Sequence, residues 1–342
     1  MALSPLNQRR WRNFVRNRRA YWSLWIFAVL FGISLFAEFV ANDKPILVSY
    51  RGEFYMPIFN FYPETAFGGD FQTEAVYRDP EVQVAGTQIE RGWSIWPPIP
   101  YSFNTAVDRP GAAPLPPNRQ NLLGTDGTKR DVLARVIHGF RLSIIFTLIV
   151  TGAASLIGII AGAVQGFFGG WTDLIFQRVI EIWSSTPSLY VIIIMFAILG
   201  RSFWLLVFLL VLFSWTALVG VVRAEFLRAR NLEYVRAARA LGVGNLTIMF
   251  RHMLPNAMVA MLTMLPFIIT GTISTLAILD FLGFGLPSSA PSLGELTLQA
   301  KQNLQAPWLA FTAFFTFALM LSLLIFIFEG VRDAFDPRKT FS

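Results

Sequence analysis

Long apolar runs separated by charged segments dominate the pattern of the chain. Six runs are long enough to cross a hydrocarbon core of about 30 Å, which requires roughly 20 helical residues. They lie at approximately Tyr21–Ala41, Leu142–Phe168, Ile180–Leu199, Phe203–Val222, Met258–Leu282 and Leu309–Phe328. The pattern predicts an all-α integral membrane protein with about six transmembrane helices, and a transmembrane domain over residues 142–335.

A long polar segment, residues 42–141, follows the first apolar run. Its stretch Asn42–Asp108 fits either a small subdomain with short strands or a wrap around the outer rim of a pore, and both interpretations stay open. Residues 109–119 have the composition of an extended linker. Glu38, near the outer end of the first run, fits an interfacial side chain or an intramembrane site. Val132, Val136 and Phe140 form a helical stripe that leads into the second run.

The basic residues predict how the chain is oriented. Two groups of six arginines stand out, and the first contains no acidic residue: Arg9, Arg10, Arg12, Arg16, Arg18 and Arg19 before the first run, and Arg223, Arg228, Arg230, Arg236, Arg239 and Arg251 between the fourth and fifth. The positive-inside rule places both groups in the cytoplasm. The expected topology has a cytoplasmic tail at 1–20, a periplasmic loop at 42–141, a cytoplasmic loop at 223–256 and a cytoplasmic C-terminal tail at 336–342.

Composition supports a membrane protein and argues against other classes. The chain is 54% hydrophobic and only 14% charged, which is typical of membrane proteins. Its net charge of +7 is accounted for by topology, so we expect no nucleic-acid binding. Cysteine is absent, which excludes disulfides and thiolate metal sites. The first run lacks a cleavage site of the A-x-A type and is interpreted as an uncleaved anchor.

The sequence contains no recognisable catalytic machinery. There is no G-x-x-x-x-G-K-[ST] phosphate loop, no H-E-x-x-H and no G-x-S-x-G elbow. The two histidines, His138 and His252, fall on opposite sides of the membrane in the expected topology. We therefore expect no catalytic residue, metal site or cofactor in this chain, and no enzymatic activity.

The cytoplasmic segment 231–256 reads NLEYVRAARALGVGNLTIMFRHMLPN. It predicts a short helix over Leu232–Leu241, with Asn231 as N-cap and Gly242 as the stop after the last turn. One face of this helix is apolar and carries Tyr234, Ala237, Ala238 and Leu241. A helix this short is marginal alone, so we expect a partner to dock against it. The alternative is a basic interfacial helix lying on anionic lipid.

These residues resemble the cytoplasmic signature loop of permease subunits in bacterial ABC importers. Arg236-Ala237-Ala238 fills the Glu-Ala-Ala core, with Arg236 where the family usually has Glu, and Gly242 takes the place of the glycine. The ending His252-Met253-Leu254-Pro255-Asn256 is similar to the dipeptide, oligopeptide and nickel branch. The resemblance implies that the segment couples to an ATPase through Tyr234, Arg236, Ala237, Ala238, Leu241, Gly242, His252, Leu254, Pro255 and Asn256.

A second motif, LLGTDGTKRDVLARVIHGFRLS at 122–143, resembles the same branch through Leu-Gly-Thr-Asp, Arg-Asp-Val-Leu and Gly-x-Arg-x-Ser. Its candidate residues at the outer mouth of the pathway are Gly124, Asp126, Arg130, Asp131, Arg135 and Arg141. The charged members could pair as a structural clamp or contact the substrate directly.

Three further residues are candidates for the translocation path. Pro187 and Pro266 interrupt apolar runs and mark either gating bends or static kinks. Asp280 heads LDFLGFGLPSSAPSLGEL, which resembles an outer loop of the family. Its carboxylate could attract a peptide amino group or could be solvated.

The resemblance implies the type I ABC importer permease fold and a transport role in the bacterial inner membrane. We expect a subunit that moves short peptides or peptide-like compounds inward. Its partners would be ABC ATPase subunits that bind the ATP, a second permease subunit and a periplasmic solute-binding protein. The long first loop looks most like that of the Yej-type peptide permeases, known for uptake of microcin C. The alternatives are nickel or another small solute, an ion-gradient-driven transporter, and a membrane scaffold or enzyme subunit.

Overall fold

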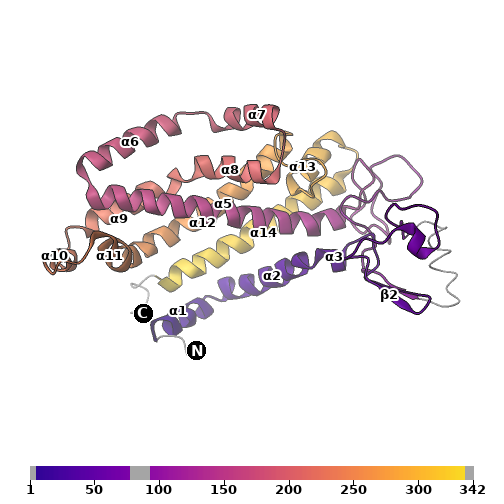
Figure 1. Cartoon of the computed structure of the whole chain (residues 1–342), viewed down its shortest axis with the longest axis horizontal. Coiled ribbons are helices and arrows are strands. Elements are labelled where there is room, and N and C mark those ends of the chain that lie inside the picture. The colour runs from indigo at the N-terminus through magenta and orange to yellow at the C-terminus, as the bar shows by residue number, and fades with distance from the viewer. Residues whose placement is uncertain (1–4, 78–92, 336–342) are drawn as a thin grey trace. The chain divides into compact units, whose positions relative to one another are not determined.

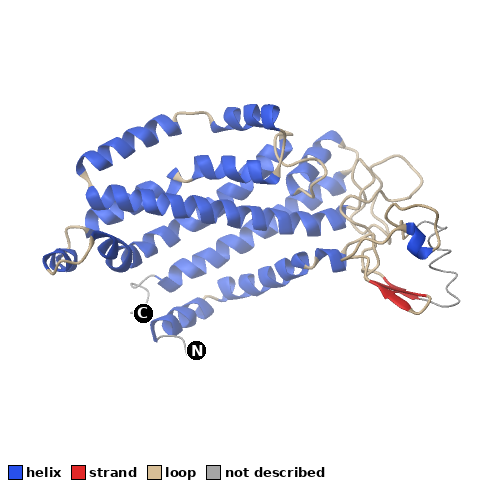
Figure 2. Ribbon diagram, in the orientation of Figure 1, coloured by secondary structure: helices blue, strands red, loops and turns tan. Residues whose placement is uncertain are grey.

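The computed structural model describes residues 5–77 and 93–335 (Figure 1). It is largely helical, and strands occur only as short pieces within 47–95 of the described chain (Figure 2). The chain divides into two compact units. The first unit comprises Met1–Ala28, Ser143–Pro287 and Phe317–Ser342, and the second comprises Val29–Leu142 and Ser288–Thr316. We describe each unit by itself. The predicted tail at 336–342 lies outside the described residues.

Helices account for most of the described chain. Their bounds are α1 Pro5–Arg16, α2 Arg18–Leu35, α3 Ala37–Val40, α5 Val132–Phe168, α6 Gly170–Ser184, α7 Ser188–Leu199, α8 Phe203–Ser214, α9 Thr216–Ala229, α10 Glu233–Ala240, α11 Asn245–Thr247, α12 Leu254–Phe281, α13 Leu293–Gln302 and α14 Pro307–Phe335, with η2 at Ile248–Met253. The helical stripe expected from Val132 is confirmed, because α5 begins there.

Four helical stretches in the described residues are long and apolar enough to cross a membrane: Val132–Phe168, Phe203–Ala229, Asn245–Phe281 and Pro307–Phe335. A bent pair, α6 with α7, makes a fifth if it counts as one span. The all-α membrane class is confirmed. The first predicted span, Tyr21–Ala41, is not one continuous helix, because α2 ends at Leu35 and α3 begins at Ala37. Helix α2 also begins with two charged residues, Arg18 and Arg19. A sixth span in this region stays a prediction.

The third predicted span, Ile180–Leu199, is wrong as a continuous helix. The structure breaks it between Ser184 and Ser188, and the two helices differ in direction by 66°. Pro187 is the N-cap of α7; its ring disfavours helical backbone in the residue before it, so the helix ends there. Pro266, in contrast, lies inside the uninterrupted α12.

In the first unit, glycines spaced by four let α5 lie directly on α9. A Cβ placed on Gly158 would come within 2.4 Å of the Trp215 carbonyl oxygen, and one on Gly162 within 2.7 Å of the Val219 carbonyl oxygen. A Cβ on Gly166 would meet the α9 backbone in the same way. Small residues at this spacing are the usual way for helices to approach closely in lipid.

The polar loop in the second unit contains a three-stranded antiparallel sheet of order β2-β1-β3. The strands are β1 (Leu47–Tyr50), β2 (Glu53–Tyr55) and β3 (Trp93–Ile95), and a 3₁₀ turn, η1, spans Glu64–Phe67. In the register of β1, Val48 lies opposite Tyr55 on one side and Ser94 on the other. A small core of Val48, Phe67, Ala75 and Tyr77 packs against it. The short strands expected by the subdomain interpretation are therefore present, and a wrap around the outer rim of a pore stays an open alternative.

Substitution of Gly162 by alanine tests the close approach of α5 and α9. The new Cβ would lie 2.7 Å from the Val219 carbonyl oxygen and 2.8 Å from Val222 Cβ. We expect a loss of roughly 1–3 kcal/mol in the free energy of unfolding, because backbone cannot move aside cheaply. The matched control is Gly152→Ala on the same helix, where a Cβ meets nothing within 4 Å. Equal unfolding midpoints for the two variants in detergent would contradict the packing.

Candidate functional site

The signature loop of the first unit forms the expected short helix, one residue shorter at each end. Helix α10 spans Glu233–Ala240, against the predicted Leu232–Leu241. The predicted N-cap Asn231 is wrong: Leu232 is the N-cap, with extended backbone and no side-chain cap. The Leu232 carbonyl accepts hydrogen bonds from the Val235 and Arg236 amides at 3.1 Å. The first helical hydrogen bonds thus begin one residue beyond Asn231.

Gly242 ends the helix as the sequence predicts. Its φ is +77°, in the left-handed region that favours glycine. The Gly242 amide donates to the Arg239 carbonyl and the Val243 amide donates to the Ala238 carbonyl, both at 3.0 Å. This pair of hydrogen bonds is the Schellman arrangement that closes a helix C-terminus.

Helix α10 has one face buried in its own unit and one face open. Val235 is fully buried, whereas Leu241 is 82% exposed and Tyr234 is 38% exposed. Ala237 and Arg236 are exposed, and Ala238 is half-buried. Most of the predicted docking face is therefore accessible.

Two further exposed apolar residues lie in the loop after α10, Leu246 and Phe250, at 69% and 44% exposure. The prediction missed both. Their signal was available, since large apolar side chains in a short basic loop are unusual unless a partner covers them.

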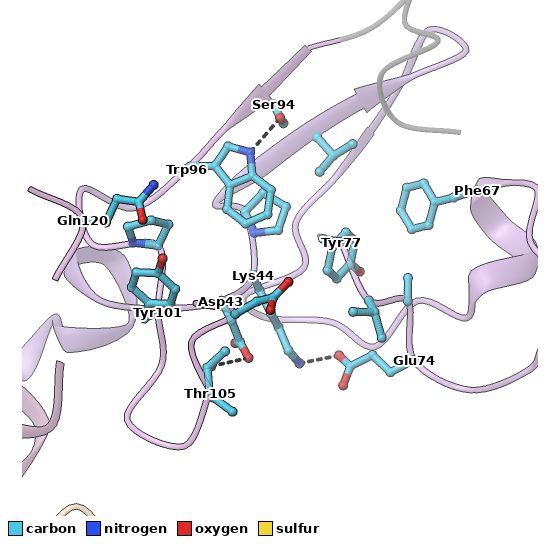
Figure 3. Close-up of a pocket in the computed structure, with 17 residues that line it drawn as sticks. Asp43, Lys44, Phe67, Glu74, Tyr77, Ser94, Trp96, Tyr101, Thr105 and Gln120 are labelled. Atoms are coloured by element: carbon cyan, nitrogen blue, oxygen red, sulfur yellow. Dashed lines mark hydrogen bonds and ion pairs between the residues drawn. The ribbon is translucent and has the colours of Figure 1, made fainter. Parts of the chain in front are cut away.

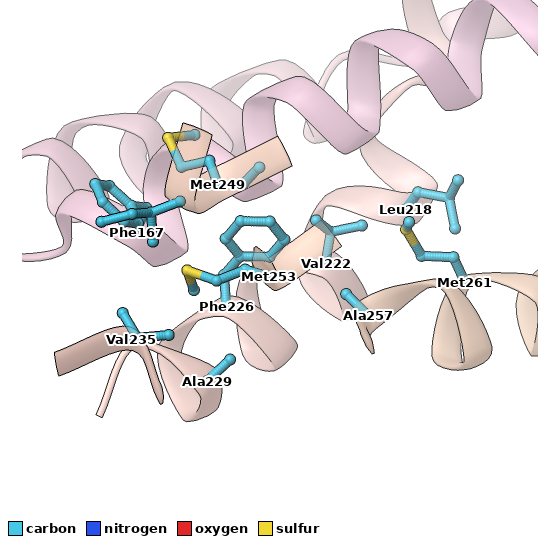
Figure 4. Close-up of a cluster of buried hydrophobic side chains, with 12 residues drawn as sticks. Phe167, Leu218, Val222, Phe226, Ala229, Val235, Met249, Met253, Ala257 and Met261 are labelled. Atoms are coloured by element: carbon cyan, nitrogen blue, oxygen red, sulfur yellow. The ribbon is translucent and has the colours of Figure 1, made fainter. Parts of the chain in front are cut away.

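The buried side of α10 belongs to an apolar cluster that ties the loop to membrane helices (Figure 4). Val235 lies among side chains of α5, α9, η2 and α12. The cluster comprises Ala163, Phe167, Leu218, Val222, Phe226, Ala229, Val235, Ile248, Met249, Met253, Ala257 and Met261. Arg239 adds a contact, with its guanidinium 4.9 Å from the centre of the Phe167 ring. A force on α10 would therefore reach α9 and α12 through packed side chains.

The end of the signature loop forms a π-helical segment, η2, that runs into α12. The Asn256 amide nitrogen donates to the Tyr234 hydroxyl at 3.3 Å and to the His252 carbonyl at 3.1 Å. Asn256 and Pro255 are exposed, while His252 and Leu254 are half-buried. The two ends of the signature are thus in direct contact.

In the second unit, the charged residues of the other motif form a buried ion network. Asp126 accepts a hydrogen bond from Arg130 Nε at 2.8 Å and lies 3.7 Å from Arg135 Nε. Glu295 bridges the two arginines, at 2.9 Å from Arg130 Nη2 and 2.5 Å from Arg135 Nη2. The Asp126 and Arg135 side chains are completely buried. The pairing expected among Asp126, Arg130 and Arg135 is present, which favours a structural clamp over direct substrate contact.

Sequence reasoning missed Glu295, although a signal for the helix that carries it was present. Glu295 stands three residues after Ser292, the spacing of a capping box. Ser292 is the N-cap of α13, and its hydroxyl accepts hydrogen bonds from the Gly294 and Glu295 amides. The Glu295 carboxylate, however, reaches the arginines instead of the cap.

Asp131 has a different role from its neighbours. Its Oδ1 accepts a hydrogen bond from the Ala134 amide at 2.8 Å, which caps the start of α5. Its Oδ2 accepts one from the Asn121 side chain at 2.8 Å. Burial raises the pKa of this carboxyl above its ordinary value. It therefore orders the helix start and takes no part in the ion network.

The remaining residues of the second motif also contact other segments of the same chain. Gly124 has a φ of +71°, and a Cβ there would lie 2.8 Å from both the Leu115 carbonyl oxygen and Trp308 Nε1. Arg141 forms a bidentate ion pair with Glu38, at 2.7 and 2.8 Å. Glu38 is thus paired within the unit.

Asp280 is buried at the end of α12, with 6% exposure. Its Oδ1 accepts a hydrogen bond from the Leu286 amide at 2.8 Å, which shapes the turn between the two residues. Of the two alternatives for Asp280, the solvated carboxylate is the one that the structure contradicts. A role in the translocation path stays a prediction.

Comparison with known families decides what this architecture belongs to. The family described as binding-protein-dependent transport system inner membrane component matches residues 154–341, which include α6 to α14 and the signature loop. A second family, described as the N-terminal TM domain of oligopeptide transport permease C, matches residues 4–57. The chain belongs to the binding-protein-dependent permease family. The permease is thus a transport component of a membrane system and not an enzyme.

Named relatives extend the likeness over the whole permease. It is 57% identical to the peptidoglycan transport system permease protein YejE of Agrobacterium fabrum, over 99% of this chain and 94% of the relative. It is 56% identical to the inner membrane ABC transporter permease protein YejE of Escherichia coli, over 98% of both chains. The oligopeptide transport system permease protein OppC of Bacillus subtilis is 32% identical over 66% of this chain and 74% of its own length.

Removal of the Glu295 charge tests the ion network of the permease. Glu295→Gln would leave the fully buried Arg135 with one carboxylate, Asp126 at 3.7 Å, besides the Phe103 and Ala290 carbonyls at 3.5 Å. We expect a loss of about 3 kcal/mol in the free energy of unfolding, because an uncompensated buried charge is costly.

Glu181→Gln is the matched control, since its ion pair with Arg178 is solvent-exposed. It should lose under about 1 kcal/mol. A detergent-unfolding titration in which both variants behaved alike would contradict the clamp.

Proposed function

We propose that this permease is the membrane subunit of an ATP-driven importer that moves short peptides or peptide-like compounds from the periplasm to the cytoplasm. The observation that carries the proposal is α10, a short helix with Val235 anchored in a buried cluster and with Tyr234 and Leu241 exposed. An apolar face left open on a rigid support is what a docking partner requires. Membership of the family supports this interpretation.

The proposed partner at α10 is an ABC ATPase subunit that binds the ATP, so that this chain itself carries no cofactor. Closure of the ATPases would move α10 together with η2, because Asn256 links the two ends of the loop. The buried cluster would transmit that movement to α9 and α12. Those helices would tilt and change which side of the membrane the path faces.

Two more partners complete the proposed assembly. The family's description as binding-protein-dependent supports a periplasmic solute-binding protein that delivers the substrate. The described residues form four apolar spans, or five if the bent pair counts as one, and we infer that so few helices line a path together with a second permease subunit. We further propose that the permease lies in the bacterial inner membrane with both termini in the cytoplasm, as the arginines of α1 and of the signature loop favour.

Peptide-like substrates agree with the names of the relatives. The Bacillus relative is named for oligopeptide transport and the Agrobacterium relative for peptidoglycan transport, and peptidoglycan contains short peptides. Nickel or another small solute, and transport driven by an ion gradient, are less favoured alternatives.

Paired substitutions on the two faces of α10 test the docking proposal. Leu241→Ala removes an exposed side chain, so it should leave the free energy of unfolding unchanged but reduce the amount of ATPase that co-purifies in mild detergent. Val235→Ala removes a fully buried one and should cost roughly 2 kcal/mol of stability. ATPase recovery unaffected by Leu241→Ala, together with loss of peptide uptake, would argue against docking at this face.

Gly242→Asp tests the turn that ends α10. A side chain at a φ of +77° is strained, and the added charge lies at the docking surface. We expect peptide uptake to be abolished and ATPase binding weakened while membrane insertion is kept. Gly244→Asp is the matched control, because Gly244 has an ordinary φ of −64° and is the N-cap of α11, where Asp is favourable. Undiminished transport by Gly242→Asp would remove the loop from the mechanism.

A further inference from the structure

The second unit contains a cavity of about 880 Å³ beside its small sheet (Figure 3). Its walls come mainly from the segment before β1, from residues 74–77, and from the stretch 94–108, which begins within β3. This volume lies within the range of small-molecule binding sites, which is about 300–1,000 Å³. None of the residues of the family motifs lines it.

Acidic residues outnumber basic ones among the described residues that line the cavity. These are Asp43, Glu74 and Asp108, against Lys44. Lys44 is already paired with Glu74. The Asp43 carboxylate accepts one hydrogen bond, from the Thr105 hydroxyl at 2.7 Å. Asp108 has no hydrogen bond or ion pair through its side chain within the described part of the chain. The excess negative charge favours a cationic ligand group.

Aromatic side chains supply the rest of a recognition surface. Trp96 and Tyr101 line the cavity on the side of 94–108, and Figure 3 shows Tyr77 and Phe67 on the other side. Aromatic faces attract a primary ammonium through cation–π interaction and also pack against apolar side chains. The amino-terminal end of a peptide combines these two features, a cationic ammonium group and neighbouring apolar side chains.

Tyr77 adds an unsatisfied polar group. Its side chain is only 8% exposed, and its hydroxyl has no hydrogen-bond partner among the described residues. Burial raises the pKa of Tyr77 well above its ordinary value, so the hydroxyl stays protonated and can donate. A buried donor without an acceptor is costly. The hydroxyl oxygen is closed off from the cavity, so a ligand carbonyl would accept its hydrogen bond once the ring turns towards the ligand.

We propose that this cavity binds the amino-terminal end of a short peptide, with the ammonium group at Asp108 and Asp43, the side chains against Trp96 and Tyr101, and a peptide carbonyl on the Tyr77 hydroxyl. The inference rests on the proposed import of peptides. It adds a binding site outside the apolar helices, where the chain itself would select its substrate.

Photo-crosslinking to the full-length permease in lipid nanodiscs tests the site. The probe is a tripeptide that carries a benzophenone side chain, a free amino terminus and no lysine or arginine; its N-acetylated form is the matched ligand. Mapping by mass spectrometry should place the adducts on the segment around Trp96–Tyr101. The acetylated peptide should need about tenfold more ligand for half-maximal yield, since a charged contact is lost.

Variants separate the charge from the fold. Asp108→Asn should raise the half-maximal peptide concentration about tenfold, whereas Asp70→Asn, an exposed acid of the same unit that does not line the cavity, should leave it unchanged. Tyr77→Phe should weaken binding severalfold without lowering the thermal midpoint, because the lost hydroxyl has no partner within the described chain.

Equal yields for the free and acetylated peptides would overturn the proposal, as would adducts on other segments or unchanged binding by Asp108→Asn. A permease that still co-purifies with an ATPase and supports uptake, but binds no peptide here, would lose this site and keep the proposed function. A permease that binds the peptide here but co-purifies with no ATPase would keep this site and lose the proposed function.

Discussion

The burial of Val235 holds the signature loop in a usable position. An eight-residue helix has too few hydrogen bonds to persist alone in water, so α10 depends on the side chains beneath it. Val235 enters a cluster with Phe226, Met249 and Met253, which brings α9 and η2 against the loop. Because the face with Val235 packs against the rest of the permease, Tyr234 and Leu241 stay exposed on the other face. Anchoring and exposure are therefore two results of the same helix geometry.

A different constraint governs the second unit. Arg135 is a fully buried charge, and its cost is tolerable only if carboxylates surround it. Asp126 and Glu295 meet that requirement and join α5 to α13 within the unit. The Gly124 turn packs under Trp308 beside them. The motif residues pair with one another inside the unit, which favours a structural role for them.

Local patterns in the sequence predict local structure well here. The Gly242 stop, the helical stripe from Val132 and four of the six apolar runs each depend on near neighbours, and the structure bears them out. The break at Pro187 changed a predicted span, whereas Pro266, marked in the sequence in the same way, leaves α12 continuous. The partner of Arg135 could not be predicted, since Glu295 lies 160 residues further along the chain. The cavity near Trp96 likewise depends on segments that only the folded chain brings together.

The most direct test of docking by α10 uses the absence of cysteine from the chain. A sole cysteine introduced by Leu241→Cys, labelled with a thiol-reactive photo-crosslinker in native membranes, would report what lies against the exposed face. Leu304→Cys is the control, because Leu304 is equally exposed, at 85%, in the second unit. The account predicts an adduct with an ABC ATPase from position 241 and none from position 304. A transport-competent permease that gave no ATPase adduct from position 241 would contradict it.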